Sequence, residues 1–251
     1  SILDELKQSD FVVKSIKKGE KKRSPNAPFI TSTLQQEAGS KLGFPIKKTM
    51  MIAQNLYEGI NIEGVGSVGL ITYMRTDSRR ISIEAQQDAM KFIKQVYGEE
   101  YLPDKPNIYK NKSAAQDAHE AIRPSDVTLT PQKIKGSLST DQYKLYKLIW
   151  ERFLASQMKS ALYNTVNVDI SAGKYIFKAS GSQLQFAGFT LLYDENKDAD
   201  KNDSAIIPEL IEGEKLKLKK LDSKQHFTQP PSRYTESSLV KALEEKGIGR
   251  P

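Results

Sequence analysis

The sequence predicts a chain with a helical domain inserted between the two halves of a β-rich domain. Apolar residues recur at helical spacing from about residue 30 to about residue 160. Residues 11–23 have the composition of a strand, and after Tyr163 apolar and polar residues alternate as in further strands. We therefore expect three parts. A discontinuous β-rich domain comprises residues 1–30 and 160–233, and an inserted helical domain comprises residues 31–159. Residues 234–251 begin a further helical domain.

The first helices have recognisable start and stop signals. Ser32 with Gln35 forms a capping-box pattern, and Gly43 follows the last apolar position of that helix. A second helix is expected from about Pro45 to Gly59, followed by a turn rich in glycine before residue 70. Helix, short turn, helix and glycine-rich hairpin is the order of a winged-helix (CAP-like) module.

The later helices and strands are predicted from the same kinds of sequence signal. Ser82 and Ser139 are expected to cap helices, and Trp150 lies on the apolar side of the second of them. Thr235 is expected to cap a last helix that ends at Gly247. Further strands are expected at residues 175–178, 184–189 and 215–221, with a polar loop at 194–203.

Composition narrows the class of protein. The chain has 251 residues, of which 38% are hydrophobic and 27% charged, as in ordinary globular proteins. The excess of 38 Lys and Arg over 31 Asp and Glu gives a net charge of +7, which favours a polyanionic partner. Absence of cysteine excludes disulfides and thiolate zinc sites, and no apolar run of membrane-spanning length is present.

The stretch Gly69-Leu-Ile-Thr-Tyr-Met-Arg-Thr-Asp-Ser78 contains the strongest candidate for a reactive residue. It reads as an apolar strand that ends at Tyr73, flanked by a cation, a carboxylate and hydroxyls. A phenol has an ordinary pKa of about 10, so it needs a nearby cation or base to act as a nucleophile. On an extended chain Arg75 lies on the same face as Tyr73, where its guanidinium can hold a phosphate oxygen. A buried strand tyrosine beside a surface arginine is the alternative.

Four other stretches contribute, with residues 69–78, to one family resemblance. In chain order they are residues 28–36 (Pro-Phe-Ile-Thr-Ser-Thr-Leu-Gln-Gln), 49–54, 118–124 (Ala-His-Glu-Ala-Ile-Arg-Pro) and 247–251 (Gly-Ile-Gly-Arg-Pro). Together with residues 69–78 they resemble the bacterial type IA DNA topoisomerases. Met74 and the His-Glu-Ala-Ile-Arg-Pro motif are similar to topoisomerase I rather than topoisomerase III.

The resemblance implies a function and a site. It implies relaxation of negatively supercoiled DNA by cleavage of one strand through a 5′-phosphotyrosine, strand passage and religation. Because the phosphotyrosine conserves bond energy, no ATP is needed, and no phosphate-binding Walker loop is present. Tyr73 and Arg75 are the expected catalytic residues, and His119 and Arg123, taken to lie one helical turn apart, are expected to contact DNA. Asp77 and Arg250 complete the expected DNA-binding set.

The same resemblance implies the setting of the site. The β-rich part would form an arch over a central hole, and residues 234–251 would open a DNA-binding domain. Mg²⁺ would bind to a preceding Toprim domain that nothing in this sequence resembles, so we expect a fragment that binds no metal and is inactive alone. The expected partner is DNA, preferably single-stranded, with no membrane association. The protein is expected to be a monomer in the bacterial cytoplasm, associated with the nucleoid.

Two other functions remain open. A tyrosine recombinase also combines tyrosine, arginine and histidine, but its usual His-x-x-Arg spacing is absent, since Arg123 lies four residues after His119. A recombinase would attach its tyrosine to a 3′ phosphate and a type IA enzyme to a 5′ phosphate. A winged-helix DNA-binding module with a structural tyrosine would bind DNA without any covalent adduct.

Overall fold

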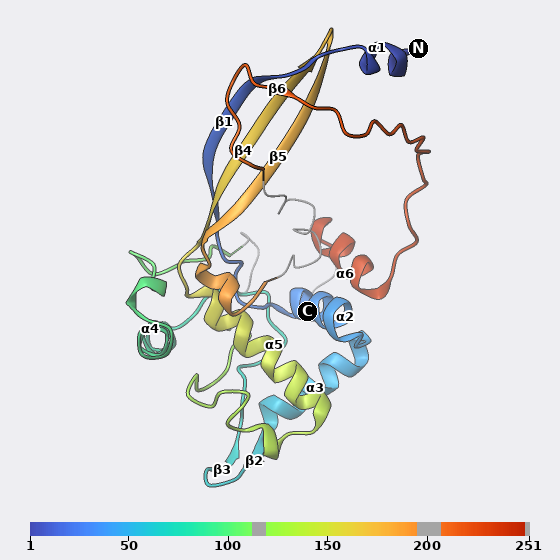
Figure 1. The fold of residues 1–251 in the computed structure, drawn as a ribbon. Helices are drawn as coiled ribbons and strands as arrows, with labels where there is room; N and C mark the ends of the chain where they lie inside the picture. The colour runs from blue at the N-terminus through green and yellow to red at the C-terminus, as the bar shows by residue number, and fades with distance from the viewer. Residues whose placement is uncertain (112–118, 195–206, 249–251) are drawn as a thin grey trace. The chain divides into compact units, whose positions relative to one another are not determined.

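The computed structural model describes residues 1–111, 119–194 and 207–248 (Figure 1). Its helices are α1 to α6, at Ile2–Lys7, Thr31–Leu42, Ile46–Glu58, Ile83–Val96, Thr140–Ser156 and Glu236–Glu245. Its strands are β1 to β6, at Phe11–Arg23, Ile60–Ile62, Gly66–Val68, Ala161–Ala172, Tyr175–Phe186 and Lys215–Leu216. Short 3-10 turns lie at Glu99–Tyr101, Lys135–Ser137 and Gly188–Leu191.

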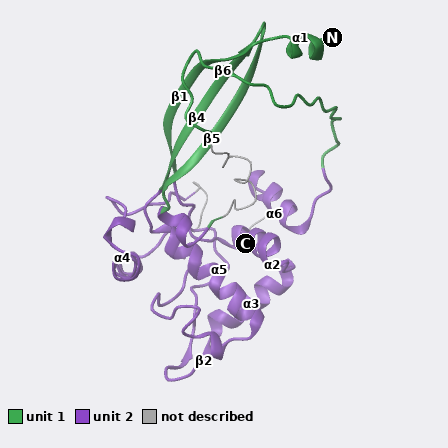
Figure 2. Ribbon diagram, in the orientation of Figure 1, with its two compact units in different colours: residues 1–23, 161–187, 194–231 green, residues 24–160, 188–193, 232–251 purple. Residues whose placement is uncertain are grey.

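The chain divides into two compact units (Figure 2). Unit 1 consists of residues 1–23, 161–187 and 194–231, and unit 2 of residues 24–160, 188–193 and 232–251. The fold therefore mixes α and β structure, with antiparallel sheets. The domain limits expected from the sequence differ from these unit limits by several residues and stay a prediction.

Unit 1 is built on an antiparallel sheet with strand order β5, β4, β1, β6. β1 pairs with β4 from Phe11 opposite Ala172 to Arg23 opposite Ala161, with a bulge after Val13. β4 continues into β5 through a turn at Gly173, whose φ of 58° is easily reached only by glycine. One continuous strand β5 replaces the two short strands expected at residues 175–178 and 184–189, because it pairs with β4 from Tyr175 to Phe186, with one register shift between Leu162 and Tyr163.

A small apolar cluster stabilises one end of this sheet. Leu6, Phe11 and Ala172 are buried there, and the Phe11 and Phe177 rings lie 5.4 Å apart. β6 joins β1 at the same end, opposite Phe11 and Val12. The strand expected at residues 215–221 is limited to these two residues, Lys215 and Leu216.

Unit 2 packs its helices around α5. The buried face of α5 includes Leu145, Ile149, Trp150, Phe153 and Leu154, as the helical spacing predicted. The Trp150 indole N–H donates to the Val127 carbonyl oxygen at 3.0 Å, so this buried ring has its polar atom satisfied. α2, α3 and α4 add to this core Leu34, Ala38, Ile52, Ala53, Leu56, Ala89 and Ile93.

Most predicted helix starts are confirmed. Ser82 and Ser139 accept hydrogen bonds from the backbone N–H groups of Ala85 and Gln142, and Thr235 accepts one from Ser238. The prediction for Ser32 is wrong, because α2 starts two residues earlier, with Ile30 at the cap position, and the Thr33 hydroxyl accepts the Ile30 N–H at 3.0 Å. The Ser32 side chain is therefore available for another contact.

A buried arginine fixes the chain that enters α2. Arg152 of α5 is 7% exposed, its Nε donates to the Ala27 carbonyl oxygen at 2.6 Å, and its guanidinium lies 4.9 Å from the centre of the Phe29 ring. Burial lowers the pKa of Arg152. Phe29 in turn forms an isolated backbone bridge with Ile122, so this contact supports the segment after His119. Within the described ranges no helix is long and apolar enough to cross a lipid bilayer.

Candidate active site around Tyr73

The segment that contains Tyr73 follows the β2–β3 hairpin without forming a strand. The Leu70 N–H donates to the Leu56 carbonyl oxygen at 2.7 Å, and Ile71 forms only an isolated bridge with Pro124. A Cβ atom on Gly69 would lie 2.6 Å from the Tyr57 carbonyl oxygen, which explains glycine at this close approach. The expected strand ending at Tyr73 is therefore wrong, because these hydrogen bonds go to α3 and to separate loops.

Threonine contacts fasten the segment on both sides of Arg75. The Thr31 hydroxyl donates to the Met74 carbonyl oxygen at 2.7 Å and accepts from the Thr76 N–H at 2.8 Å. Met74 is fully buried and Thr76 is 3% exposed. Tyr73 is half-buried and Arg75 is exposed, whereas Met74 and Thr76 are buried. The shared face of Tyr73 and Arg75 stays a prediction.

Tyr73 lies between two aromatic side chains. Its ring centre is 5.1 Å from that of His119 and 5.5 Å from that of Tyr57, which it meets edge to face. Tyr57 belongs to the last turn of α3 and is 41% exposed. Sequence reasoning missed Tyr57, because the β2–β3 hairpin separates it from Tyr73 and no periodic pattern joins them. The structure thus brings Tyr73 and His119 together, as the shared motifs implied.

We expect the Tyr57 ring to keep the Tyr73 ring in position. Under the expectation that Tyr73 cleaves DNA, Tyr57→Leu in an enzyme that includes the remaining domains should lower the cleavage rate by up to about tenfold, since an aromatic pair contributes about 0.5–1.5 kcal/mol. Tyr57→Phe retains the ring and should cleave at the normal rate. The single-turnover cleavage rate at saturating DNA measures this effect separately from binding. Equal rates for the Leu and Phe variants would show that the ring contact is unimportant.

Residues 119–125 are not helical, contrary to the expectation that His119 and Arg123 lie one helical turn apart. Ala121 and Ile122 donate their N–H groups to the carbonyl oxygens of Arg80 and Phe29 at 2.8 Å. Pro124 further disfavours helix at the residue before it. His119 is exposed, whereas Arg123 is directed to neighbours of its own segment.

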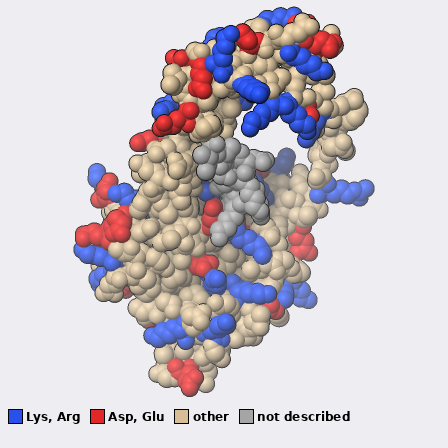
Figure 3. Space-filling model, in the orientation of Figure 1, with Lys and Arg blue, Asp and Glu red and all other residues tan. Residues whose placement is uncertain are grey.

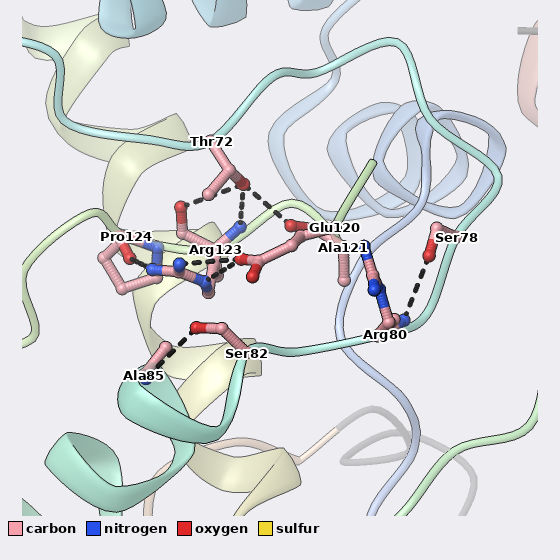
Figure 4. A network of polar contacts seen from close by, with 9 residues as sticks. All are labelled: Thr72, Ser78, Arg80, Ser82, Ala85, Glu120, Ala121, Arg123 and Pro124. Atoms are coloured by element: carbon pink, nitrogen blue, oxygen red, sulfur yellow. Dashed lines mark hydrogen bonds and ion pairs between the residues drawn. The ribbon is translucent and has the colours of Figure 1, made fainter. Parts of the chain in front are cut away.

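The Arg123 side chain is held within the protein. Its Nε donates to the Glu120 carboxylate at 2.8 Å, its Nη2 lies 2.7 Å from the same oxygen, and its Nη1 donates to the Pro124 carbonyl oxygen at 3.0 Å (Figure 4). Only 14% of this side chain is exposed. Glu120 therefore orients Arg123, and a DNA phosphate would have to share these donors.

Thr72 connects this segment to the tyrosine (Figure 4). Its hydroxyl donates to the Ala121 carbonyl oxygen at 2.7 Å and accepts from the Arg123 N–H at 3.0 Å. The Thr72 N–H donates to the Arg123 carbonyl oxygen, also at 3.0 Å. One residue thus ties the backbone before Tyr73 to the segment that carries His119.

Replacement of this hydroxyl should destabilise the fold. Thr72→Val leaves the Arg123 N–H and the Ala121 carbonyl oxygen without their partner, so the free energy of unfolding should fall by about 1–3 kcal/mol. Thr72→Ser retains the hydroxyl and should lose much less. Urea denaturation followed by circular dichroism measures both variants. If valine and serine give the same midpoint, the hydroxyl has no structural role.

Three arginines lie close in sequence to the tyrosine, and sequence reasoning singled out only one of them. Arg75 and Arg80 are exposed and Arg79 is half-buried. In the described part of the chain, no hydrogen bond or ion pair involves their guanidinium groups. Figure 3 shows that basic and acidic side chains are mixed over the visible face of the molecule.

Asp77 and Arg250 are the remaining residues of the expected DNA-binding set. Asp77 is half-buried beside the buried Ser78. Arg250 lies outside the described residues.

Magnesium requires several oxygen ligands, and among residues 1–111, 119–194 and 207–248 no group of three or more His, Cys, Asp or Glu side chains is placed to hold a metal ion. We assign no chemical step to a metal.

Comparison with known proteins identifies the class. A sequence model of the DNA topoisomerase family matches residues 1–251, so the chain belongs to this family. Its structure is similar to that of full-length topoisomerase I from Thermotoga maritima, with a TM-score of 0.82 and 42% sequence identity. The match places the chain among the bacterial type IA topoisomerases. It covers 99% of this chain and 40% of the Thermotoga chain, so this chain spans less than half the length of that relative.

Proposed function

We propose that this chain provides the nucleophile of a type IA DNA topoisomerase that relaxes negatively supercoiled DNA. One observation carries the proposal: Tyr73 is half-buried against His119 and lies two residues from an exposed arginine. Thr31 fixes the backbone on both sides of Arg75, so the segment that carries both side chains is held in place before substrate binds. Such preorganisation favours reaction with a phosphodiester.

The proposed reaction is a balanced transesterification. The Tyr73 Oη attacks the phosphorus and the bond from phosphorus to the DNA 3′ oxygen breaks. The phenolic proton passes to solvent or a neighbouring base, and the leaving 3′ oxygen takes up a proton to become a hydroxyl. The phosphate stays on the tyrosine as a 5′-phosphotyrosine, and the reverse attack religates the strand after strand passage. Because no bond energy is lost, ATP is not required.

The neighbouring residues have distinct proposed roles. Arg75 stabilises the charge that develops on the phosphoryl oxygens, a kind of contribution often worth about 3–4 kcal/mol. His119 and Arg123 contact the DNA backbone, with Glu120 orienting Arg123. Asp77 and Arg250 are proposed to complete the DNA-contacting set.

Further features of the intact enzyme belong to the same proposal. The order α2, α3, β2–β3 supports a winged-helix-like module, and we propose that unit 1 contributes to an arch. Magnesium is proposed to bind to residues beyond this chain. We further propose that the enzyme acts as a monomer on single-stranded segments in the bacterial cytoplasm, in association with the nucleoid.

Noncovalent binding to this chain should be electrostatic. We expect weak binding of single-stranded DNA, with the logarithm of the affinity falling by roughly 0.7 for each neutralised phosphate per tenfold rise in salt. Magnesium should act only through ionic strength, and relaxation should not occur. Fluorescence anisotropy over a salt series measures the slope. Magnesium-dependent relaxation by residues 1–251 would contradict this expectation, and tight sequence-specific duplex binding would favour the winged-helix alternative.

The cleavage polarity tests the proposed function. An enzyme extended to the length of the Thermotoga relative is incubated with oligonucleotides labelled at either end, and adducts are trapped with denaturant. The label on the 3′ side of the cut should stay with the protein, because that fragment begins with the 5′ phosphate. Retention of the other label would indicate recombinase-like chemistry, and no adduct with either label would leave only DNA binding.

A further inference from the structure

Helix α6 lies against α2 (Figure 1), and two of its acidic side chains bond to residues of α2 and α3. The Glu244 carboxylate accepts hydrogen bonds from the Ser32 hydroxyl at 2.9 Å and from the Gln36 side-chain amide at 3.2 Å. At the other end of α6, Glu236 accepts the Ile46 N–H at 3.0 Å. Ser32 is the residue whose predicted capping role proved wrong, so its hydroxyl serves this contact instead.

Gly39 marks the closest approach of the two helices. A Cβ atom at Gly39 would lie 2.0 Å from the Ser237 hydroxyl oxygen and 3.3 Å from its Cβ. Glycine inside a helix costs about 1 kcal/mol relative to alanine, and here it leaves room for α6.

The contact of α6 with the rest of unit 2 buries little apolar surface. None of its residues is buried, and Leu239 and Leu243 are 44% and 36% exposed. Hydrophobic burial therefore contributes little, and partly exposed hydrogen bonds hold the helix. Such an element undocks at a small free-energy cost compared with unfolding of the core.

The covered residues adjoin the tyrosine segment. Ser32 follows Thr31, which bonds to the backbone of both Met74 and Thr76 around Arg75. The first turn of α2 carries no acidic residue of its own, so Glu244 brings a negative charge to this place. A carboxylate and a phosphodiester accept hydrogen bonds from the same hydroxyl and amide donors.

We propose that Ser32 and Gln36 form a contact surface for a phosphate of the DNA strand that runs past Tyr73, and that Glu244 of α6 covers this surface until the strand displaces it. The proposal rests on the proposed function, since it needs a strand beside Tyr73. Docked α6 inhibits strand binding because Glu244 occupies both donors. Undocked α6 leaves both donors to the phosphate.

A matched pair of variants tests this surface. Binding of a fluorescent oligothymidylate to the 251-residue chain is measured at low salt for Glu244→Gln and Glu245→Gln, which change the net charge equally. Glu245 is exposed on the same helix. Glu244→Gln should bind on the order of threefold to tenfold tighter than Glu245→Gln, because it raises the fraction of chains whose surface is uncovered. Equal affinities would overturn the proposal.

Two further variants test the contact surface and its coverage by α6. Ser32→Ala in the Glu244→Gln background should remove most of the gain, whereas a full gain without Ser32 would overturn the proposed contact. Gly39→Leu should displace α6, because rotation of the Ser237 hydroxyl does not make room for a side chain of that size, and so should also tighten binding. Hydrogen exchange of residues 236–245 shows whether α6 is displaced. If α6 is displaced and the affinity for the oligothymidylate is unchanged, α6 does not cover the contact surface.

The assay is independent of catalysis. It measures noncovalent binding, so a clear difference between the two glutamate variants, together with no cleavage by the extended enzyme, would refute the proposed chemistry alone. Absence of oligothymidylate binding by all variants would refute the surface, even if the extended enzyme cleaves DNA.

Discussion

Tyr73→Phe should reduce DNA cleavage by the extended enzyme to background while leaving fold and noncovalent binding nearly intact. The substitution removes one hydroxyl, and within the described residues no hydrogen bond involves that hydroxyl, so the free energy of unfolding should change by no more than about 0.5 kcal/mol. The ring contacts with Tyr57 and His119 are retained. Covalent adduct yield and thermal unfolding are measured side by side. Adducts formed by the phenylalanine variant would refute the assignment of the nucleophile.

Arg75→Lys should lower the cleavage rate at least about tenfold with little change in stability. Lysine keeps the charge but loses the planar pair of donors that fits a phosphate, and loss of such stabilisation costs 10²–10³-fold in analogous sites. Arg75 is exposed, so thermal unfolding should barely move. The cleavage rate at saturating DNA is the measurement, with Arg80→Lys as a control of equal charge on a neighbouring exposed arginine. Normal relaxation by Arg75→Lys would rule out paired phosphate contacts.

Local sequence signals predicted the helices of unit 2 well. Ser82, Ser139 and Thr235 cap helices as expected, because a hydroxyl at the helix start satisfies a backbone N–H within the same few residues. Pro45 and Gly59 flank α3, and Trp150 lies in the core. These features depend on neighbours in sequence and on one apolar face, which a single sequence contains.

The geometry of the site depends on contacts between distant segments, and sequence reasoning erred there. The strand expected at Tyr73 and the helical turn expected at His119 are absent, because Thr72 and Ile122 bond to segments about 50 and 90 residues away. Motif resemblance still brought Tyr73 and His119 into one site. It gave no indication of Tyr57 as a neighbour of Tyr73, or of Glu244 as the partner of Ser32.

Mapping of the covalent adduct tests the central claim most directly. The extended enzyme is allowed to cleave an oligonucleotide, the adduct is digested with protease and nuclease, and the modified peptide is sequenced by mass spectrometry. We expect a nucleotide joined through its 5′ phosphate to Tyr73. Attachment to Tyr57, whose ring centre is 5.5 Å away, or to any other residue would contradict the account.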